Sequence, residues 1–213
     1  MRYLIFIGFI ALFSCGNNRA DMAKTFCDTT CFNDTVRYAG DHKLKPYVTI
    51  TMKNCAADTI TWSHEALPTQ RQMQVSTMLE RNIRLRPAAM DCYIKDTSYA
   101  WLQFNDCETG RGYLMKLPFN KKESISTMKS ALTRFDKKFV IPEDLRAYAD
   151  YSMIYVVDVN TGKKEQMTFQ EELKIDFDKL HKTFDSINVS HNRIYVVLNK
   201  DGKKVPLEKS ISL

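Results

Sequence analysis

The order of apolar and polar residues in the first half of the chain predicts β-hairpins. Apolar side chains alternate with polar ones over Tyr47–Lys53 and again over Thr59–Trp62, with the polar segment Cys55–Asp58 between them. Alternation places apolar side chains on one face of a strand, and two such runs joined by a short polar segment are typical of a hairpin. Tyr93–Lys95 and Tyr99–Asn105 predict a second hairpin.

Three later segments share one pattern, in which an apolar run leads into a polar turn that ends in glycine. They are Leu102–Gly110, Ile154–Gly162 and Ile194–Gly202, and they begin 52 and 40 residues apart. Glycine at this position supplies the positive φ that tight hairpin loops need. We expect a hairpin at each, arising either by duplication or by convergence on one kind of turn.

Two segments between these hairpins carry apolar residues at helical spacing. The two stripes are Ile125-Met128-Leu132-Phe135 and Leu173-Phe177-Leu180-Phe184-Ile187. Such stripes predict amphipathic helices packed on a sheet, and Thr168 with Glu171 forms a capping box for the second. The predicted fold class is therefore α+β: an antiparallel sheet of successive β-hairpins with two amphipathic helices packed on it, and with Phe177 and Phe184 in the core.

The first fifteen residues have the pattern of a secretory signal peptide. Arg2 precedes the apolar run Leu4–Phe13, which is too short to span a bilayer, and the small residue Ser14 precedes Cys15. The run Leu12–Cys15 resembles the lipobox of bacterial lipoproteins, although Phe13 departs from the usual residue type. This resemblance implies cleavage between Ser14 and Cys15 and lipid attachment to the Cys15 thiol. The alternative is a plain secretory signal whose cleavage site lies beside a cysteine.

This interpretation divides the chain into three parts. Residues 1–14 are a signal peptide, residues 15–43 a lipidated polar tether, and residues 44–213 a single α+β domain. Several buried acyl chains anchor a protein stably where one does not. We expect an exported lipoprotein of the bacterial cell envelope that is anchored in a lipid bilayer. The outer membrane is favoured over the inner membrane, and either leaflet is open.

Five cysteines follow the predicted lipidation site: Cys27, Cys31, Cys55, Cys92 and Cys107. Exported proteins fold in oxidising compartments, so we expect disulfides, and the odd number leaves a thiol free or paired with another chain. We expect at least one bond among Cys55, Cys92 and Cys107, which lie in the predicted domain. The Cys27–Cys31 spacing also allows a redox or copper-binding pair.

Composition and charge mainly exclude certain classes of protein. The chain has 213 residues, 44% of them apolar and 26% charged, which excludes a disordered tail protein and a multi-span membrane protein. Loss of Arg2 with the signal peptide reduces the net charge from +6 to +5. The excess is small and the basic residues are dispersed, so we expect no nucleic-acid partner.

The sequence contains no motif that predicts catalysis, a metal site or a cofactor. It lacks a nucleophile elbow, a phosphate loop, a dinucleotide fingerprint and a two-histidine metal motif. Asp158–Gly162 and Asn199–Gly202 resemble calcium loops, but two lysines follow each and repel a cation. We therefore expect no catalytic residues, no metal ligands and no cofactor.

Aromatic residues are the remaining candidates for ligand contacts. Trp62, Tyr99, Trp101 and Tyr113 either line a ligand face or fill the core. The predicted function is a non-enzymatic envelope lipoprotein, a binding, adaptor or inhibitor module for an unknown ligand or envelope protein. The alternative is a secreted envelope hydrolase with a site built from dispersed carboxylates.

The C-terminal segment Ile154–Leu213 resembles the C-terminal domain of energy-transducing TonB proteins. The resemblance rests on a strand with a glycine turn, a second strand, a predicted helix and the Gly-Lys-Lys-Val-Pro segment Gly202–Pro206. It implies a similar topology only, because the Tyr-Pro and Trp-Pro landmarks of that family are absent.

Overall fold

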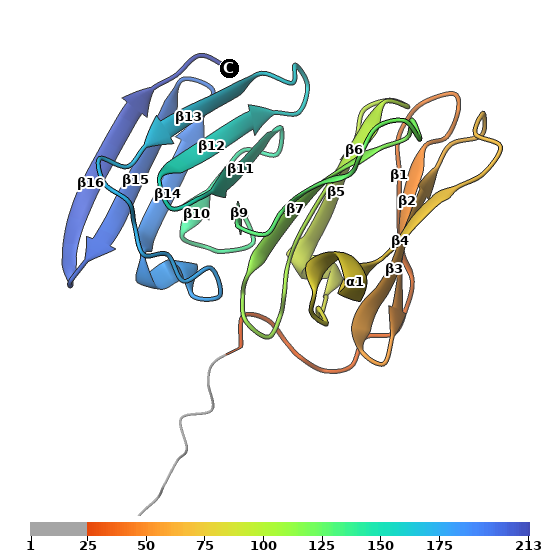
Figure 1. Cartoon of the computed structure of the whole chain (residues 1–213), viewed down its shortest axis with the longest axis horizontal. Helices are drawn as coiled ribbons and strands as arrows, with labels where there is room; N and C mark the ends of the chain where they lie inside the picture. The colour runs from red at the N-terminus through yellow and green to blue at the C-terminus, as the bar shows by residue number, and fades with distance from the viewer. Residues whose placement is uncertain (1–24) are drawn as a thin grey trace, which may run out of the picture.

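The chain folds into four four-stranded β-sheets, here called sheets A to D (Figure 1). The structure is a computed structural model and describes residues 25–213. Sheet A contains β1 (Val36–Ala39), β2 (Tyr47–Lys53), β3 (Ala56–Ser63) and β4 (Arg71–Gln74). Sheet B contains β5 (Met90–Ile94), β6 (Tyr99–Asn105), β7 (Gly112–Pro118) and β8 (Ser126–Met128).

The second half of the chain builds sheets C and D. Sheet C contains β9 (Ala131–Leu132), β11 (Leu145–Ala149), β12 (Met153–Asp158) and β13 (Lys164–Thr168). Sheet D contains β10 (Phe139–Val140), β14 (Phe184–Ser190), β15 (Arg193–Lys200) and β16 (Lys203–Ser210). Strands pair antiparallel except β10, which crosses from sheet C to pair parallel with β14.

Helical structure in residues 25–213 is confined to three short segments. They are α1 (Val75–Leu79) and the 3₁₀ turns η1 (Pro87–Ala89) and η2 (Leu180–Lys182). Within this part of the chain, no helix has the length and apolar character needed to cross a membrane.

The four sheets pack face to face in the order A, B, C, D. One large apolar core lies between sheets A and B and another between sheets C and D, so the molecule consists of two sandwiches joined at sheets B and C (Figure 1). In β6, Leu102 and Phe104 face the first core, whereas Tyr99 and Trp101 belong to the cluster that contacts sheet C. This two-residue alternation lets sheets B and C be covered on both faces.

The three repeated hairpins are confirmed as β6–β7, β12–β13 and β15–β16. Their glycines, Gly110, Gly162 and Gly202, have φ angles of 81°, 76° and 80°. In the first two turns an aspartate, Asp106 or Asp158, accepts hydrogen bonds from backbone N–H groups two and three residues further on. An Asp-x-x-Thr-Gly sequence thus closes both turns in the same way.

The α+β prediction is wrong, because neither predicted helix forms. The first stripe folds as β8 and β9, and the second as a loop, η2 and β14. In β14 the register shifts between Phe184 and Ser186, so Phe184 and Ile187 both face the core although they are three residues apart. A β-bulge therefore imitates helical spacing in the sequence.

Several side chains of the predicted second helix also lie in positions that differ from those expected. Phe184 is fully buried, as predicted, whereas Phe177 only packs against the border of the same core. Thr168 ends β13 rather than capping a helix, and Glu171 forms an ion pair with Lys200 at 2.6 Å. The helix on which the TonB resemblance depends is therefore absent from this segment.

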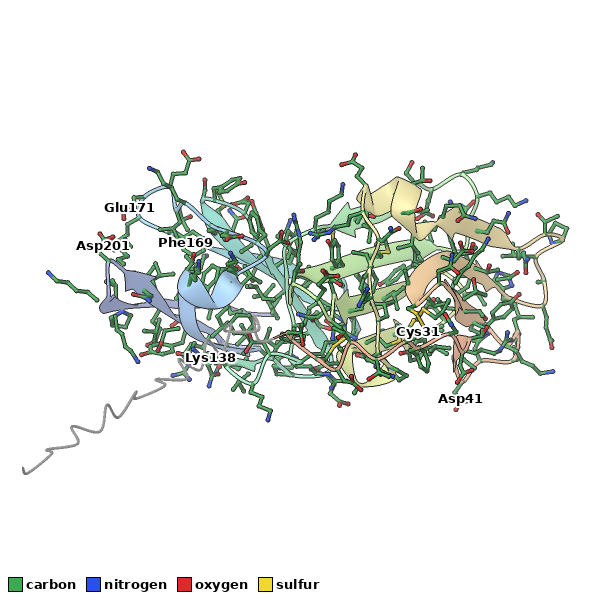
Figure 2. All side chains as sticks on the ribbon, turned by 90° about the horizontal axis from the view of Figure 1, so that it is seen from below. Cys31, Asp41, Lys138, Phe169, Glu171 and Asp201 are labelled. Carbon is green, nitrogen blue, oxygen red and sulfur yellow. A yellow bond between two sulfur atoms is a disulfide. The ribbon has the colours of Figure 1, made fainter. Side chains whose placement is uncertain are left out.

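An N-terminal strap, residues 25–33, runs beneath sheets A and B and is fixed there by two disulfides. Cys27 bonds to Cys107 and Cys31 bonds to Cys55. Figure 2, which views the molecule from below, shows Cys31 under sheets A and B at the opposite end from Asp201. The strap and β1 lie inside the segment predicted as a tether, so ordered structure begins before Leu44.

The expectation of disulfides is confirmed, but the expected bond among Cys55, Cys92 and Cys107 is wrong. Each bond instead joins the strap to a sheet, and Cys92 carries a free thiol. The Cys27–Cys31 pair is excluded as a redox motif by the same pairing. Ser14 and Cys15, the predicted cleavage and lipidation positions, lie outside the described residues.

Candidate functional site

Sheets B and C meet at a junction that is less apolar than the two sandwich cores. Its apolar part is a small cluster bordered by partly buried side chains. The cluster consists of Trp101, Leu114, Ala131, Val157 and Val159, and its border of Tyr93, Tyr99, Met128 and Tyr148. Interfaces between packed units are preferred places for ligand sites, so the junction is the first region to consider.

Glycine at position 112 allows the two sheets to approach closely. A Cβ atom there would overlap the backbone carbonyl of Ala131 in β9. Beside this contact, the Thr133 hydroxyl donates a hydrogen bond to the buried Asn105 side chain. One end of the junction is therefore closed by tight backbone packing and a polar pair.

On sheet B, a lysine lies over two aromatic rings. Trp101 and Lys116 are direct cross-strand neighbours on β6 and β7. The Lys116 Nζ lies 4.2 Å from the ring centre of Tyr99 and 5.8 Å from that of Trp101, and the two rings pack edge to face. Cation–π contacts at these distances are attractive, so the ammonium group is held against the rings.

Sheet C carries a matching group on its face toward sheet B. Tyr148 and Tyr155 are paired across β11 and β12 and stack with ring centres 4.8 Å apart. Lys164 Nζ lies 4.2 Å from the Tyr155 ring centre. We call the six residues Tyr99, Trp101, Lys116, Tyr148, Tyr155 and Lys164 the aromatic–lysine wall.

A hydrogen bond fixes the Tyr155 end of this wall. The Tyr155 hydroxyl donates to Asp150 at 2.9 Å, and this bond raises the pKa of Tyr155 above its ordinary value. Burial opposes ionisation of Asp150, but the Ser152 N–H and the Tyr155 hydroxyl outweigh it and lower the pKa of that carboxyl. The ring is therefore positioned by an ionised partner.

A small pocket of about 170 Å³ lies between β5 and β11, beside the wall. We call it the arginine pocket; it is lined by Asp91, Cys92, Tyr93, Arg134, Glu143, Asp144 and Arg146. One oxygen of Asp91 accepts a hydrogen bond from Arg146 at 3.1 Å and forms an ion pair with Arg134 at 3.3 Å. The shared carboxylate draws the two guanidinium groups together.

Arg146 is the most deeply placed charge of the pocket, with a side chain only 1% exposed. Its Nη1 donates to the backbone carbonyls of Glu143 and Leu145, at 2.6 and 2.9 Å. Burial lowers the pKa of the guanidinium, and Asp91 acts in the opposite direction. This network holds the group rigidly.

The two other carboxylates of the pocket also have cationic or histidine partners. Glu143 pairs with Arg134, and Asp144 lies 3.0 Å from Nε2 of His191. The Glu143 side chain is 84% exposed, whereas those of Asp91 and Arg134 are 24% and 28% exposed. Glu143 is thus the outermost member of the pocket.

Two buried N–H donors of the junction have no acceptor among residues 25–213. They are Trp101 Nε1 and Arg146 Nε. Buried donors are normally paired, and of these two residues Arg146 also lines the arginine pocket described above.

The structure places the four aromatic residues proposed from the sequence as ligand contacts in two different environments. Tyr99 and Trp101 lie in the wall, whereas Trp62 and Tyr113 are buried in the core between sheets A and B. Trp62 donates from Nε1 to the Pro118 carbonyl at 2.8 Å, so its role is structural. Sequence reasoning missed Arg134 and Arg146; the available signal was an arginine within the otherwise apolar run Leu145–Ala149.

The described residues contain neither a reactive cysteine nor a metal site. Burial raises the pKa of the free Cys92 thiol above its ordinary value, which makes it a poor nucleophile. Within residues 25–213, no group of three or more His, Cys, Asp or Glu side chains is arranged to hold a metal ion.

No protein-family model matches the sequence, and no curated protein matches it. One similar solved structure is described as "AfRom2 CNH domain"; it has 10% sequence identity and a TM-score of 0.21 over 85% of this chain. This chain covers 65% of that one.

Proposed function

We propose that the chain is an exported, lipid-anchored module of the bacterial cell envelope that binds a ligand at the junction of sheets B and C. The anchor is the acylated Cys15 inferred from the lipobox resemblance. The two disulfides support export, because such bonds persist in oxidising compartments.

The short segment between Cys15 and Cys27 would keep this module near the membrane surface. Cys15 and Cys27 are 12 positions apart, and a fully extended segment of that length spans at most roughly 40 Å. Because Cys27 is bonded to Cys107 at the end of sheet B, the anchor would act on the lower end of sheets A and B. The junction would then be presented at a limited height above the bilayer.

The observation that carries the binding role is the wall together with the arginine pocket. Aromatic faces, lysines and converging arginines combine stacking with hydrogen-bond donation, which suits a polar ligand with acceptor oxygens. The alternative role as a hydrolase receives less support, because Asp91 already accepts a hydrogen bond from Arg146 and Asp144 is engaged by His191, which leaves Glu143 as the one weakly held carboxylate of the pocket. A general acid or base needs a free site toward its substrate.

The experiment is a binding comparison between the wild-type protein and a Tyr99→Ala/Tyr155→Ala variant. Each immobilised protein is incubated with defined envelope glycans and peptides, and retained molecules are identified by mass spectrometry. We expect the wild type to retain a ligand that the variant loses. Tyr47→Ala is a matched control, since Tyr47 is a partly exposed tyrosine of sheet A that also stacks with a cation, Arg37. Equal retention by all three proteins would show that the junction is not the site.

A further inference from the structure

We infer that the arginine pocket binds the carboxylate group of a small polar ligand, and that Glu143 occupies Arg134 as an internal substitute for that group. This inference rests on the proposed binding role and assigns a chemical class to the ligand.

The position of Glu143 is the first argument. Its carboxylate contacts Arg134 although most of its side chain lies in solvent. An ion pair with such an exposed partner contributes little to stability, because solvent screens the charges. A ligand carboxylate can therefore replace Glu143 on Arg134 at little cost, while Asp91 keeps the guanidinium in place.

Charge balance favours a carboxylate over a phosphate. Two arginines face three carboxylates in the pocket, so the carboxylates already outnumber the guanidinium groups by one. Exchange of the Glu143 carboxylate for that of a ligand leaves the local charge unchanged. A phosphate dianion would add negative charge beside Asp91 and Asp144. The planar guanidinium fork also matches the geometry of a carboxylate.

Arg146 provides a second, fixed donor. Asp91 and two backbone carbonyls hold its guanidinium, and its buried Nε–H has no acceptor in the described part of the chain. A group that is already ordered loses little entropy when it binds a ligand, which makes it effective for recognition.

The size of the pocket limits the ligand. A volume of about 170 Å³ is small beside the roughly 300–1,000 Å³ of clefts that hold drug-sized ligands. The ligand is therefore a small acid or the terminal unit of a longer chain. A sugar acid and a peptide C-terminus both present the required carboxylate.

The test is a calorimetric titration of the purified protein with two pairs of probes. D-Glucuronate is compared with D-glucose, and N-acetylglycine with N-acetylglycinamide, so each pair differs by the presence of a carboxylate. We expect the acid of at least one pair to bind and its neutral partner not to bind. The pair that binds identifies the source of the carboxylate.

Two variants test the roles of the side chains. Arg134→Gln should weaken binding at least tenfold, whereas Glu143→Gln should strengthen it several-fold because the internal competitor is lost. The Glu143 backbone carbonyl, which accepts from Arg146, is retained in the second variant. Thermal melts check that both proteins fold, and Arg134→Lys replaces Arg134→Gln if the latter does not.

Three results would overturn the inference. They are the absence of acid binding to both wild type and Glu143→Gln, equal binding of acids and neutral partners, and weaker binding by Glu143→Gln. If the Tyr99→Ala/Tyr155→Ala comparison still identifies a ligand in that case, the proposed function stands and only the carboxylate class is wrong.

Discussion

The Cys27–Cys107 bond should contribute more stability than any other single cross-link in the described chain. It joins residues 80 positions apart, whereas Cys31 and Cys55 are 24 apart. A disulfide restricts the unfolded chain, and the resulting stabilisation increases with the logarithm of the number of residues in the loop that it closes. The expected stabilisation is about 4.5 kcal/mol for the long loop and about 3.5 kcal/mol for the short one. Removal of the long-range bond should therefore destabilise the protein by about 1 kcal/mol more.

The assay is equilibrium urea unfolding of two paired variants, Cys27→Ala/Cys107→Ala and Cys31→Ala/Cys55→Ala. With a urea dependence of about 2 kcal/mol per molar, loss of the Cys27–Cys107 bond should lower the midpoint by about 2 M. Replacing both partners avoids a new free thiol in either variant. A larger loss in the Cys31→Ala/Cys55→Ala variant, or no loss in either, would refute the reasoning that loop length determines the effect.

Two further predictions concern the buried Phe184 and the partly buried Cys92. Phe184→Ala should cost about 3–5 kcal/mol because its ring is fully enclosed between sheets C and D, whereas Phe177→Ala should cost clearly less; equal shifts in thermal melts would contradict this. In a Cys15→Ala background, Cys92 should resist alkylation by iodoacetamide at pH 8 until denaturant is added. Burial raises the pKa of the Cys92 thiol, so little of the reactive thiolate is present at that pH. Rapid alkylation of the folded protein, measured by intact mass, would contradict this.

The hairpins were predictable because their signals are local. Asp-x-x-Thr-Gly carries both the side-chain acceptor and the positive-φ residue that the turn requires, as in Asp158–Gly162. The helices were mispredicted for a reason that is not local. Pairing of β14 with β15 imposes a bulge beside Phe184, and only the partner strand determines that the chain is extended there.

The disulfides and the arginine pocket depend on contacts between distant segments. Cys27 meets Cys107 only because the strap passes under sheet B, and Asp91 meets Arg134 and Arg146 only because sheets B and C pack together. No spacing within the sequence encodes either arrangement. Residue type alone is enough to propose Tyr99 and Trp101 as ligand contacts. Distinguishing them from Trp62 and Tyr113, which are in the core, requires knowing which face of the sheet each side chain occupies.

The mass of the N-terminal peptide tests the central claim, that this is a lipid-anchored envelope protein, most directly. The protein is purified from membranes after expression in a bacterium, digested, and examined by mass spectrometry. We predict an N-terminal peptide that begins at Cys15 and carries acyl chains, and loss of both processing and membrane association in Cys15→Ala. An unmodified N-terminus at any other residue, with Cys15→Ala still processed and membrane-bound, would contradict the account.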